Sequence, residues 1–363
     1  MRTKKYFITF SVLLMAVVTM GQSCISLDGS GGTKTSGPAG FFLSIDKGET
    51  WKQLSAMPAV DGVKQLTSVS VYRLFTDPQD NKALYWASRE QGLFYSFDEG
   101  RSWAHSVEPF NLGFLYSLSV HPKDKCTFVA TNGRQVFKSD DCARSWTEIF
   151  REARASDAIT SVAFDPFKTT HIYMSEDNGD LLKSEDMGKN WLVANRFGNK
   201  LQQISFDNNK EGLLYVATRD SGLFRTRDSG ASWENLKDRF SGFPGSLEFR
   251  RLYLHPQKAE QIYWISEYGV ITSRNAGEEW EAINLVTPPG SVDIYGFAIN
   301  PKNDKEVYYT GTLDNRSTFY RSADGGKTWE TRKLPSQQIP TVLYVHPEKD
   351  SWIYLGYTIP PKE

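Results

Sequence analysis

An eight-residue phrase that recurs seven times constrains the fold of this 363-residue chain more than any other feature. The first copy reads SIDKGETW from Ser44, and the other copies keep its serine or threonine, its acidic or amide third residue and its final tryptophan. Successive tryptophans lie 42 to 52 residues apart, a period typical of one four-stranded propeller blade per repeat. The repeated positions are Asp46, Trp51, Asp98, Trp103, Asp141, Trp146, Asp186, Trp191, Asp228, Trp233, Asn275, Trp280, Asp324 and Trp329.

Each copy of the phrase has a local structural explanation. An Asp or Asn side chain folds back on backbone amides in a tight turn, Gly takes a positive φ, and Trp covers the hairpin. We therefore interpret the repeated residues as structural and expect no catalytic role for their carboxylates, because the repeat places them on different blades. The third copy has Ala143 where the pattern has Gly, so we expect that hairpin to be strained.

A second phrase, which reads as strand, turn and strand, precedes each copy from the second onward, as in SVHPKDKCTFVAT. Its seventh occurrence ends the chain without a following box, whereas FFLSIDKGETWKQL near the beginning has a box without this phrase. The last blade is therefore expected to combine strands from both ends, which pairs sheet edges that would otherwise be exposed. The sequence predicts an all-β, seven-bladed propeller over residues 40–358, with a tail at 359–363.

The first residues have the order of an export signal. Arg2, Lys4 and Lys5 precede an uncharged apolar run, and a small-residue stretch then ends at Cys24. We expect residues 1–23 to be a signal peptide, with Cys24 lipidated as in bacterial lipoproteins and residues 24–39 forming a Gly/Ser-rich tether. The predicted location is the bacterial cell envelope, on a lipid anchor at the periplasmic or outer surface. Ordinary signal-peptidase cleavage without lipidation is the alternative.

The two remaining cysteines are predicted to form a disulfide. Cys126 opens the second strand of its blade and Cys142 lies in the following box turn, so a hairpin near Gly133 brings both to the same end. An exported chain permits such a bond.

Composition restricts the classes of ligand. The formal net charge is −1, from 42 basic and 43 acidic residues, which argues against a dedicated nucleic-acid binder. The five histidines and three cysteines show no spacing typical of a metal site. We therefore expect neither nucleic acid, nor a metal, nor a cofactor.

The loops on one face of the predicted ring are the candidate binding surface. In a four-stranded blade, the turn between the second and third strands and the connection to the next blade share one face, and these segments vary most here. Arginine and phenylalanine recur in them, and such residues dominate protein interfaces. The alternative is a salt-bridged rim, because acidic residues share the same loops. The candidate partner-binding residues are Arg89, Arg134, Arg154, Arg196, Phe197, Arg219, Arg239, Phe240 and Arg316.

The recurrent phrase resembles the Asp-box (BNR) repeat of sialidases, sortilin-type propellers, xyloglucanases and photosystem II stability/assembly factors. With one ring, a box in every blade and an export signal, nearly the whole mature chain looks most like the assembly-factor family. That resemblance implies a non-enzymatic scaffold that binds a protein partner, such as a membrane-protein complex.

The alternative is a glycan-binding protein or a glycoside hydrolase of the sialidase or xyloglucanase type. Sialidases carry an F-R-I-P-like start, which is not found here. Xyloglucanases place two carboxylates across a cleft between two propellers, and glycoside hydrolysis needs such a pair. Because the seven boxes belong to one ring, the sequence favours the absence of enzymatic activity.

Overall fold

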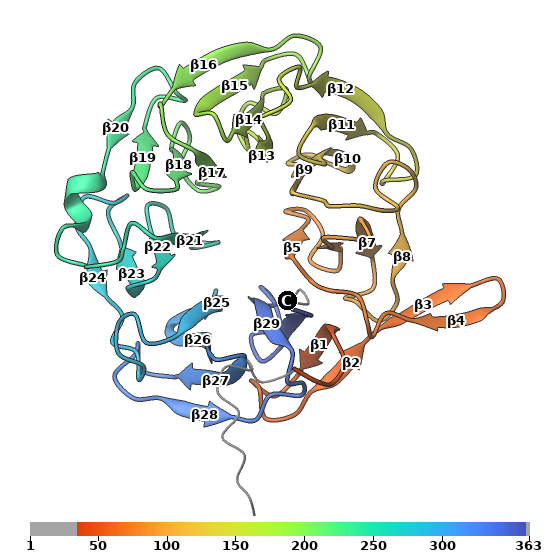
Figure 1. Cartoon of the computed structure of the whole chain (residues 1–363), viewed down its shortest axis with the longest axis vertical. Helices are drawn as coiled ribbons and strands as arrows, with labels where there is room; N and C mark the ends of the chain where they lie inside the picture. The colour runs from red at the N-terminus through yellow and green to blue at the C-terminus, as the bar shows by residue number, and fades with distance from the viewer. Residues whose placement is uncertain (1–34, 361–363) are drawn as a thin grey trace, which may run out of the picture. The chain divides into compact units, whose positions relative to one another are not determined.

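The computed structural model describes residues 35–360 and arranges their strands as seven four-stranded antiparallel sheets around a central axis (Figure 1). This confirms the predicted all-β, seven-bladed propeller. In blades one to six the strands follow one another in chain order, and the first strand of each blade is the innermost (Figure 1).

The strand bounds repeat with the blade period. Blades one to three are formed by β5 Arg73–Thr76, β6 Leu84–Ala87, β7 Leu93–Ser96 and β8 Ala104–His105; by β9 Ser117–His121, β10 Asp124–Thr131, β11 Gln135–Ser139 and β12 Thr147–Arg151; and by β13 Ile159–Phe164, β14 Ile172–Glu176, β15 Asp180–Ser184 and β16 Leu192–Arg196. Blades four to six are formed by β17 Leu201–Phe206, β18 Leu214–Thr218, β19 Leu223–Thr226 and β20 Glu234–Asn235; by β21 Phe249–Leu254, β22 Ile262–Ser266, β23 Gly269–Ser273 and β24 Glu281–Ala282; and by β25 Asp293–Asn300, β26 Asn303–Leu313, β27 Arg316–Ser322 and β28 Glu330–Arg332. A 3-10 helix, η1 (Lys237–Phe240), follows blade four.

Blade seven joins the two ends of the ring. Its order is β29 (Ile339–Val345), β30 (Ile353–Thr358), β1 (Gly40–Ser44) and β2 (Lys52–Leu54). Strand β1 pairs antiparallel with β30, with Gly40 opposite Tyr357 and Ser44 opposite Ile353. The predicted closure is confirmed, and every blade is a complete four-stranded sheet.

The position of each strand in its blade explains the pattern of apolar residues along it. The second strand of a blade is covered on both sides by neighbouring blades, so β14 is a continuous run of buried residues. The outermost strand β16 is largely exposed, and buried and exposed residues do not alternate clearly along it. The core is thus a series of layers between blades, with aromatic side chains such as Trp86 and Trp264 fully buried.

The Asp-boxes fold through bonds within eight residues of sequence. In the first box, the Ser44 hydroxyl donates to Asp46 and accepts from the Gly48 amide, while the Thr50 amide and hydroxyl donate to the Asp46 carboxylate at 2.9 and 2.6 Å. Hydrogen bonds, led by the one from the seventh box residue, lower the pKa to about 2 for Asp186, Asp228 and Asp324. The carboxylates of these three boxes are therefore ionised parts of structural turns.

Ala143 adopts the conformation expected for glycine. Its φ is +64°, and its amide still donates to the Ser139 hydroxyl, so the box is complete despite the substitution. A left-handed backbone costs a residue with a Cβ more than it costs glycine. The positive φ of Ala143 therefore supports the prediction of local strain at this hairpin.

The box tryptophans link successive blades. The indole N–H of Trp103 donates to the Leu54 carbonyl of blade seven at 3.0 Å, and that of Trp191 donates to the Ile149 carbonyl of blade two at 3.2 Å. Trp329 makes the same kind of bond from blade six to the Asn284 carbonyl, at 2.7 Å. The repeat thus also supplies contacts between blades.

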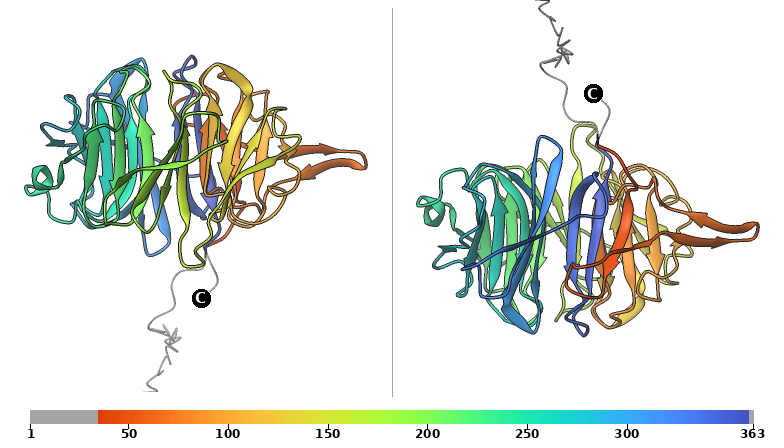
Figure 2. Two further views of the ribbon diagram at one scale, coloured as in Figure 1. Left: turned by 90° about the horizontal axis from the view of Figure 1, so that it is seen from above. Right: turned by 90° about the horizontal axis from the view of Figure 1, so that it is seen from below.

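A hairpin that the sequence did not predict projects from the side of the ring (Figure 2). Its strands are β3 (Ala56–Ala59) and β4 (Gly62–Gln65), and Val60 at its tip is fully exposed. Within residues 35–360, no helix has the length and apolar character needed to cross a membrane.

Candidate active site in the mouth of the propeller

A cavity of about 650 Å³ opens at one end of the central channel. We call it the mouth cavity. It lies on the face formed by the turns between second and third strands and by the connections between blades, which is the face that the sequence analysis selected. Its polar lining residues are Tyr72, Arg73, Arg89, Arg250, Arg251, Ser291, Asp293, Tyr295, Thr312, Asp314, Asn315, Thr341 and Thr358.

Three separate parts of the ring supply the charged side chains of the mouth cavity. Arg73 begins β5 of blade one, Arg250 and Arg251 lie at the start of β21 of blade five, and Asp293 begins β25 of blade six. Asp314 lies in the turn between β26 and β27, with a φ of +48°. Because these positions are the ends of inner strands or the turns beside them, the ring brings them together at the channel entrance.

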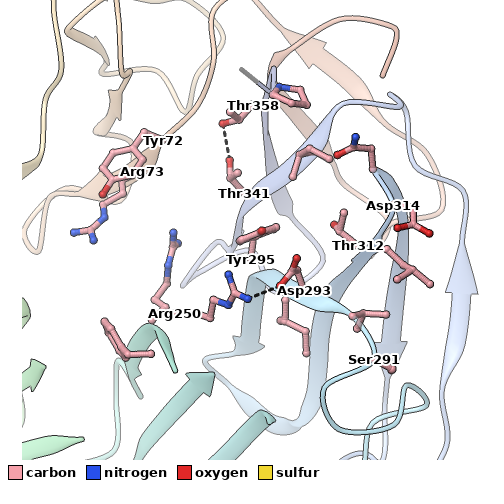
Figure 3. A pocket seen from close by; sticks show the side chains of 18 of the residues that line it. Tyr72, Arg73, Arg250, Ser291, Asp293, Tyr295, Thr312, Asp314, Thr341 and Thr358 are labelled. Carbon is pink, nitrogen blue, oxygen red and sulfur yellow. Dashed lines mark hydrogen bonds and ion pairs between the residues drawn. The ribbon is translucent and has the colours of Figure 1, made fainter. Parts of the chain in front are cut away.

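The Asp293 carboxylate of the mouth cavity is ion-paired. The Arg250 guanidinium donates to Asp293 at 2.5 Å and also lies 5.6 Å from the centre of the Tyr295 ring (Figure 3). Asp293 pairs in register with Thr312, two residues before Asp314, so both carboxylates belong to blade six. Figure 3 shows these residues on one side of the cavity and Tyr72 and Arg73 on the other. A pair of carboxylates in a cavity of this size is compatible with acid–base chemistry on a bound small molecule.

Only one of the nine candidate partner-binding residues lines the mouth cavity. Arg89 does so, with its guanidinium over the Tyr72 and Phe114 rings at 5.1 and 5.8 Å. Arg219, in a turn of blade four, and Arg316, at the start of β27 in blade six, are exposed and do not line it. The mouth cavity opens on the face that the sequence analysis selected, but that analysis did not name Tyr72, Arg250, Asp293 and Asp314 as site residues. Their only local signal was a polar residue at or near a strand end.

The other candidate arginines are engaged within the protein. Arg134 donates to the carbonyls of Arg154, Ala155 and Asp157, and so supports the connection between blades two and three. Arg196 pairs with Asp180 at 3.3 Å. Arg239 contacts Glu234 and Glu278, and Glu278 belongs to the box of blade five. For these side chains the salt-bridged rim describes the structure better than one continuous binding surface.

The two phenylalanines predicted to contact a partner pack against other aromatic rings, and Phe240 is buried whereas Phe197 is half-buried. Phe240 is 2% exposed and packs on Trp264 and Trp280. Phe197 packs against Phe224 and Trp233 in the layer around blade four. Phe240 is therefore not available at the surface to contact a partner, because an apolar side chain in a connection between blades can turn inward to cover a box tryptophan.

Of the three cysteines, two form a disulfide in the structure. Cys126 and Cys142 are bonded with their Cα atoms 4.1 Å apart, and the Cys142 amide donates to the Cys126 carbonyl at 3.0 Å. Cys24 lies outside the described residues, as do the signal peptide and most of the tether.

A buried acidic pair lies on the same face, between blades two and three. The carboxyl groups of Glu152 and Glu176 contact each other, and the Arg154 guanidinium reaches both, at 3.0 and 2.8 Å. Glu176 is fully buried, and its Oε1 accepts no hydrogen bond. Burial, followed by the neighbouring Glu152, raises the pKa of Glu176 well above its usual value. The pair therefore holds a proton at neutral pH.

The proton on Glu176 predicts a pH-dependent stability. Because the folded-state pKa lies above the unfolded value, Glu176 lowers stability progressively as pH rises above about 4.5, until the folded protein also releases the proton. A Glu176→Gln variant keeps a neutral side chain of the same shape, so its melting temperature should exceed that of the wild type increasingly from pH 5 to pH 8. Thermal unfolding followed by circular dichroism measures the difference. Glu211→Gln is the control, because Glu211 is exposed. Melting temperatures of wild type and Glu176→Gln that change in parallel with pH would contradict the prediction.

With the fold and the cavity described, comparison with known proteins identifies the family. The model for sortilin (neurotensin receptor 3) of the Sortilin-Vps10 family matches residues 39–180 and 268–359, which is more than half of the chain. The chain belongs to the Sortilin-Vps10 family. This confirms the resemblance to sortilin-type, Asp-box propellers.

The curated relatives of this Sortilin-Vps10 member are xyloglucanases. A probable oligoxyloglucan-reducing end-specific xyloglucanase of Neosartorya fischeri is 25% identical over 245 residues, which cover 55% of this chain and 30% of the relative. A xyloglucanase of a Paenibacillus species is 23% identical over 287 residues, which cover 72% of this chain and 25% of the relative. The chain thus spans less than a third of the length of these relatives.

Solved structures with a similar fold include enzymes and a peptide-binding protein. The GH74 xyloglucanase of Xanthomonas campestris superposes with a TM-score of 0.62 at 15% identity, covering 88% of this chain and 52% of that enzyme. YCF48 bound to a D1 peptide superposes with a TM-score of 0.57 at 16% identity, covering 80% and 94%. At these identities the likeness establishes the shared propeller fold.

The comparisons overturn one prediction from the sequence. A non-enzymatic assembly scaffold was expected, with a glycoside hydrolase as the alternative, but the curated relatives are xyloglucanases. The error came from treating a single ring as unable to form a site between carboxylates. The mouth cavity shows that one ring places Asp293 and Asp314 at the same opening.

Proposed function

We propose that this Sortilin-Vps10 member is a glycoside hydrolase that binds an oligosaccharide in the mouth cavity. The observation that carries the proposal is the presence of two carboxylates, Asp293 and Asp314, in one cavity of about 650 Å³. Cavities of this size accommodate small ligands, and the relatives with xyloglucanase activity support a glycan.

The two carboxylates suit different steps of glycoside hydrolysis. One carboxyl group must protonate the glycosidic oxygen of the leaving sugar. The other must be ionised and act from the opposite face of the sugar ring, either as a nucleophile or as the base that activates water. Asp293 is ion-paired with Arg250, so we assign it the carboxylate role, and Asp314 is the proposed proton donor. The hydroxyl and amide groups of Ser291, Thr312 and Asn315 would meet sugar hydroxyls.

The test measures release of reducing ends by the purified full-length chain. Substrates are xyloglucan, its oligosaccharides and a panel of other plant and microbial glycans. Asp293→Asn and Asp314→Asn should each lower turnover by about 10²- to 10⁴-fold while leaving the circular dichroism spectrum unchanged. Asp220→Asn is the matched control, because Asp220 is an exposed aspartate in the equivalent turn of blade four and does not line the cavity. Hydrolysis that both variants retain, or no hydrolysis of any glycan in the panel, would contradict the proposal.

We further propose that the propeller is exported and held at the cell envelope by a lipid on Cys24. The support is the order of basic, apolar and small residues before that cysteine. Metabolic labelling with a radioactive fatty acid should label the wild type and not Cys24→Ala, and only the wild type should sediment with membranes. Equal labelling of both forms would contradict lipidation at this position.

A further inference from the structure

Two arginines stand at the junction between the mouth cavity and a deeper one. The deeper cavity, of about 230 Å³, lies on the inner strands and is lined by Leu74, Phe75, Gln203, Tyr253 and Tyr344 among others. Arg73 and Arg251 line both cavities. Their side chains therefore mark the passage from the mouth into the channel.

Neither arginine has an acidic partner. Among the described residues, Arg73 and Arg251 make no ion pair and no side-chain hydrogen bond; the Arg73 guanidinium lies 5.2 Å from the Tyr72 ring centre. Burial and the charge of Arg73 lower the pKa of Arg251 to about 10. Most other buried or half-buried arginines of the chain are paired, as Arg225 is with Glu278. Both side chains are half-buried and line open cavities, so water reaches them. Two neighbouring guanidinium groups nevertheless repel each other, and an anion bound between them would relieve that repulsion.

The charge balance of the mouth cavity agrees with this. Four arginines line it, including Arg89 and Arg250, against the two carboxylates Asp293 and Asp314, which leaves an excess of two positive charges. The whole chain carries a net charge of −1, so the excess is local. Asp293 is bound to Arg250, so it does not neutralise the arginines at the junction.

We propose that Arg73 and Arg251 form an anion subsite that recognises the carboxylate of an acidic, uronate-containing oligosaccharide. The planar guanidinium matches a carboxylate with two parallel hydrogen bonds. Ser291, Thr341 and Thr358 donate their hydroxyl protons to backbone carbonyls, so their oxygens remain on the wall as acceptors. Such acceptors suit sugar hydroxyls better than apolar side chains of a peptide. This inference rests on the proposed glycan function and names the substrate class of the same cavity.

The experiment compares ligands that differ only in charge. Isothermal titration calorimetry with the full-length chain measures the Kd of cellotetraose and of cellotetraose oxidised to carboxylates at C6. The acidic form should bind at least about tenfold more tightly, and this preference should weaken with added salt. Arg73→Gln and Arg251→Gln should each bring the two Kd values within about twofold of each other.

Arg219→Gln is the control variant, because Arg219 is exposed on blade four and does not line either cavity. Thermal melting of each variant checks that it is folded, and removal of one of two neighbouring like charges should not lower stability. Equal affinity for the two sugars would overturn the inference, as would an acidic preference that survives both substitutions. Tighter, competing binding of a short peptide through its terminal carboxylate would also overturn it.

The result of the calorimetric experiment can be distinguished from that of the hydrolysis assay. Binding is measured without turnover, so a charge preference without any hydrolysis contradicts only the proposed function. Hydrolysis of neutral xyloglucan without a charge preference contradicts only the anion subsite.

Discussion

Replacing Trp103 with alanine is expected to lower the free energy of unfolding by about 3–5 kcal/mol. Trp103 is 2% exposed, stacks on Phe41 at 5.6 Å between ring centres and packs edge-on against Trp86 at 5.3 Å. Its indole N–H donates to the Leu54 carbonyl. Phe41 and Leu54 belong to blade seven and Trp86 to blade one, so the substitution opens a cavity at the seam where the ring closes.

Urea denaturation, monitored by far-UV circular dichroism, measures this effect. The dependence of the unfolding free energy on urea concentration is compared between variants. Trp329→Ala is the matched control, because Trp329 holds the same box position and makes the same bond to the preceding blade, but is only half-buried. Its loss should cost about 1–2 kcal/mol. Equal effects of the two substitutions would show that burial at the closing seam does not determine stability.

Removing the disulfide is expected to cost about 3 kcal/mol. The bond between Cys126 and Cys142 closes a loop with a sequence separation of 16, and its loss frees that loop in the unfolded chain. The box turn that contains Cys142 also holds Ala143, and both residues have positive φ values, of 60° and 64°. The cross-link thus restrains a turn whose backbone is unfavourable for residues with a Cβ.

The double variant Cys126→Ser with Cys142→Ser is compared with oxidised and with reduced wild type by urea denaturation. The reduced wild type should unfold at the same urea concentration as the double variant, since both lack the cross-link. If reduction leaves the wild-type midpoint unchanged, the bond contributes nothing measurable to stability.

The fold could be predicted because its signals are local in sequence. The Asp46 carboxylate accepts from Thr50, four residues away, and the Ser44 hydroxyl binds the Gly48 amide within the same turn. Such bonds form from neighbouring residues whatever the rest of the chain does, so the sequence records them directly. Their period then determined the number of blades, and the unpaired half-phrases at the two ends determined how the ring closes.

The loop face was predictable for the same reason, but the residues on it were not. Arg239 and Phe240 lie in one connection, yet Arg239 pairs with Glu278 of the next blade and Phe240 covers Trp264. Which way such a side chain turns depends on the neighbouring blade, and composition carries no record of it. Candidates chosen by residue type alone were therefore mostly structural.

By itself, then, the sequence determined the blades, their boxes, their number and the closure of the ring, because each rests on contacts between near neighbours. Only the tertiary structure decided the site. Arg73 and Asp293 are 220 residues apart in the chain, and they line one cavity because the closed ring brings blades one and six to the same channel, with blade seven between them. The unpaired state of Arg251 is likewise a property of its surroundings, since an arginine at the start of a strand gives no sign of whether a carboxylate will face it.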